Sequence, residues 1–311
     1  MGGRVLIALG GNAMTAPDGS ASPADQHRAI GEAMAHVAAL IRAGHEVVLT
    51  HGNGPQVGNI LLKNQLSAHV VPPVPLDWCV AQTQGTIGTL VMNALQRELG
   101  SARVATVVTR TLVDPADPAF HDPVKPIGRY FGEDEARRFE GHGQAWRSFG
   151  RGWRRVVASP RPVEILDAAA AVALIEAGFT VVAAGGGGVP VVRGADGTLT
   201  GVEAVIDKDL AAAALAAAVG ATDLVIATDV PNAMVDFGTP HARPIGEIEV
   251  AALRELQAAG HFAGGSMGPK VEAAVRFAED FGGRAVITSL HHIGAALSGN
   301  IGTRVYRGVE A

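Results

Sequence analysis

The stretch Val5-Leu-Ile-Ala-Leu-Gly-Gly-Asn12 decides the fold class of this chain. Its five apolar residues show no polar alternation, which is typical of a short strand buried on both faces of a sheet. Gly10 and Gly11 end the run. A strand of this kind belongs to a sheet that is covered on both sides.

The same kind of strand recurs along the chain, each time after a helix pattern. Ser22, Pro23 and Asp25 supply an N-cap, a first-turn proline and a first-turn acid, and the apolar stripe that follows stops at Gly44. Further helices are predicted over residues 86–99, 168–177, 208–219, 250–259 and 270–280. Further strands are predicted over 46–50, 103–109, 180–184, 223–227 and 285–288. Helices that alternate with strands predict an α/β fold with a mainly parallel sheet.

The composition excludes several classes of protein. The chain has 311 residues, of which 48% are hydrophobic and 18% charged, and a net charge of −5, so neither disorder nor nucleic-acid binding by charge is expected. No apolar run approaches the ~20 residues of a membrane span, and no targeting segment is visible. The single Cys79 excludes internal disulfides, so we expect a cytoplasmic protein that acts on a small molecule.

Residues 114–162 interrupt the alternation. This stretch contains six prolines and the basic run RGWRR at 151–155. We interpret it as an inserted lid subdomain, because structureless loops above ~15 residues are usually functional. The alternative is a long ordered surface loop.

Three predicted strands end in glycine, at Gly10-Gly11-Asn12, at Gly52-Asn53-Gly54 and at residues 185–188. In a parallel sheet these ends share the carboxyl edge, where α/β folds bind ligands. Backbone without Cβ atoms can approach an anion and direct several N–H groups at it. Each loop alone could be an ordinary tight turn, whereas three together favour an anion site.

Two familiar nucleotide motifs do not fit. Residues 264–270 lack the spacing and the final hydroxyl of a P-loop. Residues 52–58 resemble a dinucleotide loop with one extra residue, but Pro55 stiffens the turn and no strand that ends in an acid follows about 20 residues later.

Lysine is rare in this chain. There are four lysines among 25 basic residues, and two of them, Lys208 and Lys270, lie at predicted helix starts. At the start that holds Lys270, the helix dipole disfavours a cation unless an anion is bound nearby. At the other start the dipole favours the two acids, and Lys208 can face an anion. For Lys208, between two aspartates, an exposed ion pair is the alternative. Glycine loops together with lysines are what phosphoryl transfer requires.

Nine motifs, in order along nearly the whole chain, resemble those of carbamate kinases, which are members of the amino acid kinase family. They are residues 8–12 (ALGGN), 50–58 (THGNGPQVG), 82–85 (QTQG, interpreted as a turn), 113–117 (VDPAD), 125–128 (KPIG), 150–154 (GRGWR), 185–188 (GGGG), 201–209 (GVEAVIDKD) and 265–273 (GSMGPKVEA).

The resemblance implies a three-layer α/β/α sandwich around a mainly parallel open sheet. It implies an acceptor lobe over about residues 1–200 that contains the lid, a nucleotide lobe over about 201–311, and a homodimer. The implied reaction is Mg²⁺-dependent and reversible, between ATP and carbamate on one side and ADP and carbamoyl phosphate on the other. We expect it to run toward ATP in arginine or purine catabolism.

The resemblance also implies roles for single residues. Gly10, Gly11 and Asn12 would bind the transferred phosphoryl group, and Gly52, Asn53 and Gly54 the carbamate. Lys208 and Lys270 would neutralise the phosphates, and Asp209 would position both lysines. The implied nucleotide-binding residues are Gly186, Gly187, Thr228, Asp229, Val230, Met267 and Gly268. No protein ligand for a metal is expected, because Mg²⁺ would arrive with the nucleotide.

The first strand carries Ala8 where many members of the wider family have a lysine. In carbamate kinases a lysine of the inserted segment replaces it, and Lys125 matches that position. This argues against acetylglutamate, aspartate and uridylate kinases.

The chain departs from the family pattern at Pro231-Asn232, in the segment that would cover the base, at Arg129-Tyr130 and at Gly264. These differences leave two alternatives open. One is a kinase of a related carbamate or carboxylate, and the other is a non-catalytic nucleotide sensor.

Overall fold

The computed structural model describes residues 3–15, 22–100, 103–141, 143–262, 267–299 and 301–308. Its main sheet has eight strands in the order β15-β17-β16-β12-β1-β2-β9-β3. Neighbouring strands are parallel except for β16 and β17. The strands are β1 (Arg4–Leu9), β2 (Glu46–His51), β3 (Val104–Thr106), β9 (Thr180–Val182), β12 (Asp223–Thr228), β15 (Glu247–Glu249), β16 (Arg284–Ser289) and β17 (Thr303–Tyr306).

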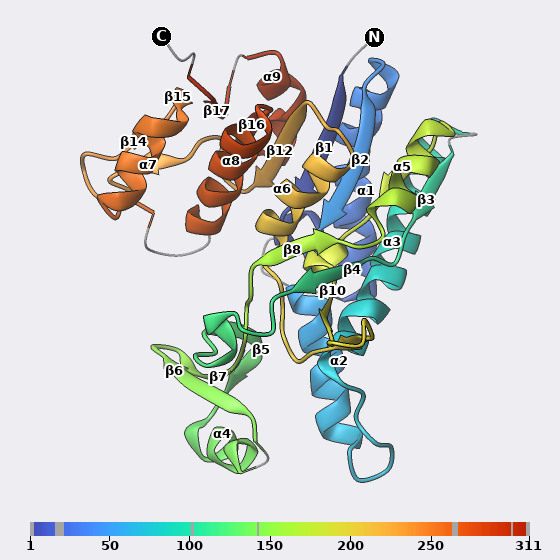
Figure 1. Ribbon diagram of the computed structural model, residues 1–311, viewed down its shortest axis with the longest axis vertical. Helices are drawn as coiled ribbons and strands as arrows, with labels where there is room; N and C mark the ends of the chain where they lie inside the picture. The colour runs from blue at the N-terminus through green and yellow to red at the C-terminus, as the bar shows by residue number, and fades with distance from the viewer. Residues whose placement is uncertain are drawn as a thin grey trace.

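Helices cover both faces of this sheet (Figure 1). Alternate residues of a strand point to opposite faces, so Leu6 and Ala8 pack with one helical layer and Val5 and Ile7 with the other. The first layer contains α5 (Ala168–Glu176), α6 (Lys208–Ala218), α7 (Val250–Ala258) and α8 (Met267–Phe281). The second contains α1 (Pro23–Arg42), α3 (Leu76–Leu99) and α9 (Ile293–Leu297). The expected three-layer sandwich is confirmed.

Every helix and strand predicted above is present, but three local predictions are wrong. Helix α3 begins at Leu76, so the segment 82–85 is helical and not a turn. Strand β3 stops at Thr106 and does not extend to Thr109. The side chain of Gln84 accepts from the N–H of Thr109 at 2.8 Å and donates to its carbonyl at 3.1 Å, and that carbonyl also accepts from the N–H of Val189 at 2.8 Å. The backbone groups of Thr109 are therefore bound outside the main sheet.

The third correction concerns the glycine loop after β2. Residues 54–58 begin helix α2 (Gly54–Ser67), and only Gly52 and Asn53 remain as the loop. Pro55 suits this start, since its fixed φ and its missing N–H are both tolerated in a first helical turn.

The insert is a folded unit and not a loop. Strands β5 (Lys125–Phe131), β7 (Gly152–Val157) and β6 (Ala145–Phe149) form an antiparallel sheet, and α4 (Glu133–Glu140) joins β5 to β6. Phe131, Phe139 and Trp146 pack with ring centroids 5.2 to 5.8 Å apart. In Figure 1 the insert lies beyond the carboxyl ends of β1 and β2.

A second small sheet, in the order β11-β10-β4-β8, was not predicted. Its strands are β4 (Arg110–Val113), β8 (Pro162–Ile165), β10 (Val189–Arg193) and β11 (Leu199–Gly201). The remaining elements are the hairpin β13 (Met234–Val235) and β14 (Arg243–Pro244) and the short helices η1 (Gly11–Ala13), η2 (Pro118–Phe120), η3 (Gly185–Gly187) and η4 (Leu290–His292). Within the described ranges, no helix has the length and apolar character to cross a membrane.

Candidate active site

The three strands that end in glycine, β1, β2 and β9, are neighbours in the main sheet. On the other side of β1 lies β12, which enters the sheet from the second half of the chain. The strand order therefore reverses at β1, and such a switch point is where open α/β sheets bind ligands. A cleft of about 1520 Å³ opens at this edge.

Most residues with an expected role line this cleft. They are Gly10, Gly11, Gly52, Asn53, Gly54, Lys125, Gly186, Lys208, Asp209, Thr228, Asp229, Gly268 and Lys270. The backbone of Asn12 lies in η1. Val230 and Met267 are not among the lining residues. Residues 264–266, in the ninth motif and its flank, lie outside the described ranges.

Gly187 does not line the cleft and has a packing role. Its carbonyl accepts from Thr111 Oγ1 at 2.8 Å, and a Cβ on it would lie 2.5 Å from the carbonyl oxygen of Ile206.

The glycine loops are pressed against each other. Gly186 has a φ of +67°, and a Cβ on it would lie 2.0 Å from Asn53 Nδ2. That nitrogen donates to Thr83 Oγ1 at 2.9 Å. At Gly10 a Cβ would lie 2.8 Å from the carbonyl oxygen of Ala227 in β12. Only glycine fits these contacts, which bring the ends of four strands around one space.

Two lysines that line the cleft share one carboxylate. Lys208 Nζ lies 2.5 Å from Asp209 Oδ1, and Lys270 Nζ lies 3.1 Å from Asp209 Oδ2. Burial of Asp209 acts to raise the pKa of its carboxyl, but the charges of and hydrogen bonds from the two lysines lower it below its ordinary value. The cluster keeps a net positive charge, which suits it to phosphate oxygens.

The insert contacts the same cluster through Asp207. This N-cap residue of α6 accepts from the backbone N–H of Asp209 at 2.9 Å with one carboxylate oxygen and from Lys125 Nζ at 2.7 Å with the other. From the sequence, Asp207 is expected only as a neighbour of Lys208. Its position before a helix and an acid was the signal for a cap.

His51 is the last residue of β2 and directly precedes the glycine loop at Gly52 and Asn53. It is buried, and its Nδ1–H donates to the carbonyl of Gly52 at 2.9 Å. Burial and then the charge of Lys208 lower its pKa to about 4, although the bond to Gly52 acts in the opposite direction. His51 is therefore a neutral support for this loop near pH 7.

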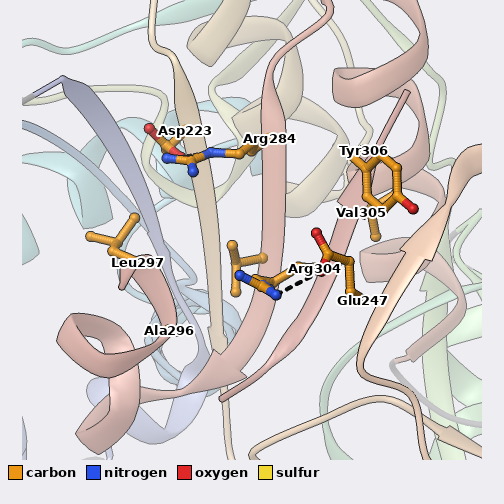
Figure 2. Close-up of a pocket in the computed structure, with 9 residues that line it drawn as sticks. Asp223, Glu247, Arg284, Ala296, Leu297, Arg304, Val305 and Tyr306 are labelled. Atoms are coloured by element: carbon orange, nitrogen blue, oxygen red, sulfur yellow. Dashed lines mark hydrogen bonds and ion pairs between the residues drawn. The ribbon is translucent and has the colours of Figure 1, made fainter. Parts of the chain in front are cut away.

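A second cavity, at the other edge of the sheet, is too small for a substrate. It has a volume of about 60 Å³ (Figure 2). Its charged groups pair with each other, Arg284 with Asp223 at 2.7 Å and Arg304 with Glu247 at 2.9 Å. Ligand pockets usually measure about 300–1,000 Å³, so the large cleft is the candidate active site.

Comparison with known proteins identifies the family to which the chain belongs. Residues 3–289 match the Amino acid kinase family. The chain belongs to this family.

The similar proteins that match over nearly their whole length are carbamate kinases, one group within this family. Carbamate kinase 1 of Enterococcus faecium is 46% identical, and the match covers 98% of this chain and 99% of that protein. A carbamate kinase of Pyrococcus furiosus is 44% identical with the same coverage. The structure of a Giardia lamblia carbamate kinase bound to AMP-PNP superposes with a TM-score of 0.93 at 42% identity and covers 99% of both chains. Within the amino acid kinases, the chain belongs with the carbamate kinases.

Proposed function

We propose that this protein is a carbamate kinase, which transfers a phosphoryl group reversibly between ATP and carbamate. The observation that carries the proposal is the cluster of Lys208, Asp209 and Lys270, which lines one cleft with the three glycine loops. The identity of 46% with a carbamate kinase over nearly the whole chain supports it.

In the ATP-forming direction, ADP attacks the phosphorus of carbamoyl phosphate. The bond from phosphorus to the carbamate oxygen breaks, and carbamate leaves with the electron pair. No proton has to move, because carbamate leaves as an anion, so positioning and charge stabilisation carry the reaction. Lys208 and Lys270 neutralise the oxygens of the transferred group, and Gly10, Gly11 and Asn12 offer backbone N–H groups to it.

Asp209 positions the two lysines. Without it, two ammonium groups would repel each other across a nearly dry space, since the side chains of Lys270 and Asp209 are only 8% and 3% exposed. Gly52, Asn53 and Gly54 bind carbamate, and the contact between Asn53 and Gly186 fixes that loop relative to β9.

The nucleotide is expected at the end of β12. Thr228 at the end of that strand, Asp229 directly after it and Gly268 from α8 line this part of the cleft. AMP-PNP bound to the Giardia lamblia relative supports an ATP-type ligand. Gly186 lies against the acceptor loop, so it fits carbamate better than nucleotide.

The cleft fits Mg²⁺ that arrives with a nucleotide. No three acidic, histidine or cysteine side chains gather to hold a metal in the described ranges. Mg²⁺ usually takes one or two carboxylates together with substrate phosphates and waters. The exposed Asp229 on the cleft wall would supply such a carboxylate. The ion would neutralise charge between the phosphates.

Further parts of the proposal rest on the family resemblance. They are a division into an acceptor lobe and a nucleotide lobe, a homodimer, a cytoplasmic location and a flux toward ATP in nitrogen catabolism. Light scattering coupled to size exclusion tests the dimer, which requires about twice the 31.8 kDa of one chain.

The decisive experiment mixes the protein with ADP, Mg²⁺ and carbamoyl phosphate and measures ATP. We expect rapid ATP formation, and much slower formation with acetyl phosphate. A faster reaction with acetyl phosphate would favour a kinase of another carboxylate. Nucleotide binding without turnover would favour a sensor.

A further inference from the structure

The basic run at residues 151–155 contributes one side chain to the cleft, and that side chain is Arg154. Successive residues of a strand point to opposite faces, so its neighbour Arg155 points elsewhere and contacts Glu203. The function proposed above gives Arg154 no role.

Arg154 differs from the other lysines and arginines that line the cleft. Lys125 pairs with Asp207, Lys208 and Lys270 pair with Asp209, and Arg28 pairs with Asp25. For Arg154, by contrast, no carboxylate partner exists in the described part of the chain. Its positive charge is thus not neutralised by the protein.

The guanidinium of Arg154 is nevertheless fixed in place. Nη2 donates to the carbonyl of Gly128 at 2.7 Å, and Cζ lies 5.2 Å from the centroid of the Tyr130 ring. Nε is buried and has no hydrogen-bond partner among the described residues. A guanidinium has five N–H donors, so most of them remain for a ligand.

The position of Arg154 lowers the stability of the insert when no ligand is bound. Across the antiparallel pair β6·β7 it lies directly opposite Arg147, and like charges in that arrangement destabilise a sheet. Asp122 compensates Arg147 but not Arg154. An anionic ligand would compensate the second charge.

The contacts of Arg154 place it on the acceptor side of the cleft. Gly128, which it binds, packs against α2 so closely that a Cβ on Gly58 would lie 3.1 Å from Gly128 Cα. Helix α2 starts directly after Asn53 in the proposed carbamate loop, and the side chain of Asn53 does not cap it. The uncapped N-terminus adds partial positive charge near the same place.

We propose that Arg154 binds the carbamoyl end of the substrate. This inference rests on the proposed function. Carbamate is a planar anion with two oxygens, which matches the fork of a guanidinium better than the single point of an ammonium group. In the ATP-forming direction negative charge collects on these oxygens as the bond to phosphorus breaks, and Arg154 stabilises it.

The test compares Arg154→Met and Arg154→Lys with Arg147→Met, a control on the facing strand whose side chain does not line the cleft. For Arg154→Met we expect the KM for carbamoyl phosphate to rise roughly 10- to 100-fold, the range for a hydrogen-bonded charge, while the KM for ADP changes less than about 2-fold. Arg154→Lys should recover only part of the loss. Added guanidinium ion should restore activity to Arg154→Met and should not raise the activity of the other proteins. Arg147→Met should behave as wild type.

Three results would overturn the assignment. A rise confined to the KM for ADP would place Arg154 on the nucleotide. Unchanged kinetics would show that it binds no substrate. A lowered melting temperature together with equal rises in the KM for both substrates would show that Arg154 only stabilises the backbone at Gly128.

Calorimetry with phosphonoacetamide, a stable analogue of carbamoyl phosphate, separates this inference from the proposed function. If wild type binds the analogue but forms no ATP, the kinase proposal fails, and weaker binding by Arg154→Met still supports the role of Arg154. If wild type forms ATP and Arg154→Met binds the analogue normally, only the role of Arg154 fails.

Discussion

Lys125 of the insert and Asp207 at the start of α6 form an ion pair, with Nζ 2.7 Å from Oδ2. Asp207 also caps the helix that begins with Lys208 and Asp209. The insert is thereby connected to the helix that carries Lys208, a proposed phosphate-binding residue, and Asp209, which positions it. An incoming phosphate can compete with Asp207 for Lys125.

This relationship predicts the effect of removing Lys125. Lys125→Ala should lower kcat by roughly 10²-fold or more and leave ADP affinity nearly unchanged, because the charge acts on the group in transfer. Steady-state kinetics measure both quantities. Lys63→Ala is the matched control, since Lys63 is the one lysine of the four that does not line the cleft. Unchanged kcat would show that the insert supplies no catalytic charge.

Removal of Lys270 should also slow the chemical step. Lys270→Ala should raise the barrier by about 2.7–4 kcal/mol, or roughly 10²- to 10³-fold in kcat, as expected for loss of a preorganised electrostatic contact. Circular dichroism establishes that the variant folds. Near-normal turnover in a folded variant would exclude Lys270 from the site.

Asp209→Asn should lower the free energy of unfolding, because it removes the carboxylate that pairs with the buried Lys270 and the partly buried Lys208. We expect a loss of about 3–5 kcal/mol near pH 7. The pKa of Asp209 is lower in the folded protein than in the unfolded chain, so its contribution is complete above ~3.9 and is lost as pH falls through the folded pKa. Urea unfolding of both proteins should show a constant difference at higher pH that shrinks below ~4.

The surface variant Asp122→Asn is the control for that experiment. The side chain of Asp122 is 73% exposed in its pair with Arg147, so its removal should change stability by at most about 1 kcal/mol. Equal effects of the two variants would contradict the central role of Asp209.

His51 predicts a second pH dependence, at higher pH. Its pKa is about 4 in the folded protein against 6.5 as reference, so the unfolded chain binds a proton that the folded protein does not. Stability should therefore fall by up to about 3 kcal/mol as pH drops from above 6.5 to about 4. His51→Asn, which keeps a donor for Gly52, should flatten this slope by one proton. An unaltered slope would mean that His51 is not buried in its neutral form.

The departure at Pro231 predicts weak base selectivity. Proline has no N–H to donate, and the side chain of Asn232 is used to bind the carbonyl of Ile245 at 2.9 Å. The ratio of kcat/KM for ADP and GDP should lie within about tenfold, the range of one hydrogen bond. A preference for ADP of a thousandfold would show that the segment still reads the base.

The central part of the fold followed from the sequence because its signals are local. A continuous apolar strand such as residues 5–9, a cap such as Ser22 and a stop such as Gly44 act within a few residues of themselves. Glycine after three strands indicated the binding edge for the same reason. Three of the four lysines line the cleft, as expected if this chain retains lysine where a compact charge is required.

Other features depended on contacts between distant residues. Helix α3 and the segment that follows β3 are joined through Gln84 and Thr109, which lie 25 positions apart. The sequence around either residue does not predict that hydrogen bond. The glycines at residues 54 and 58 are likewise compatible with a loop and with the first turns of a helix, and the structure places them in α2.

The sequence by itself determined the α/β class, the glycine-lined edge and the residue types of the cleft, because strand periodicity, backbone freedom and charge are properties of neighbouring residues. Only the tertiary structure decided that Lys125 pairs with Asp207, that Gly187 packs against Ile206, and that Arg154 rather than Arg155 faces the cleft. These outcomes depend on strand register and on packing between segments far apart in the chain, and side-chain direction reverses with each residue of a strand.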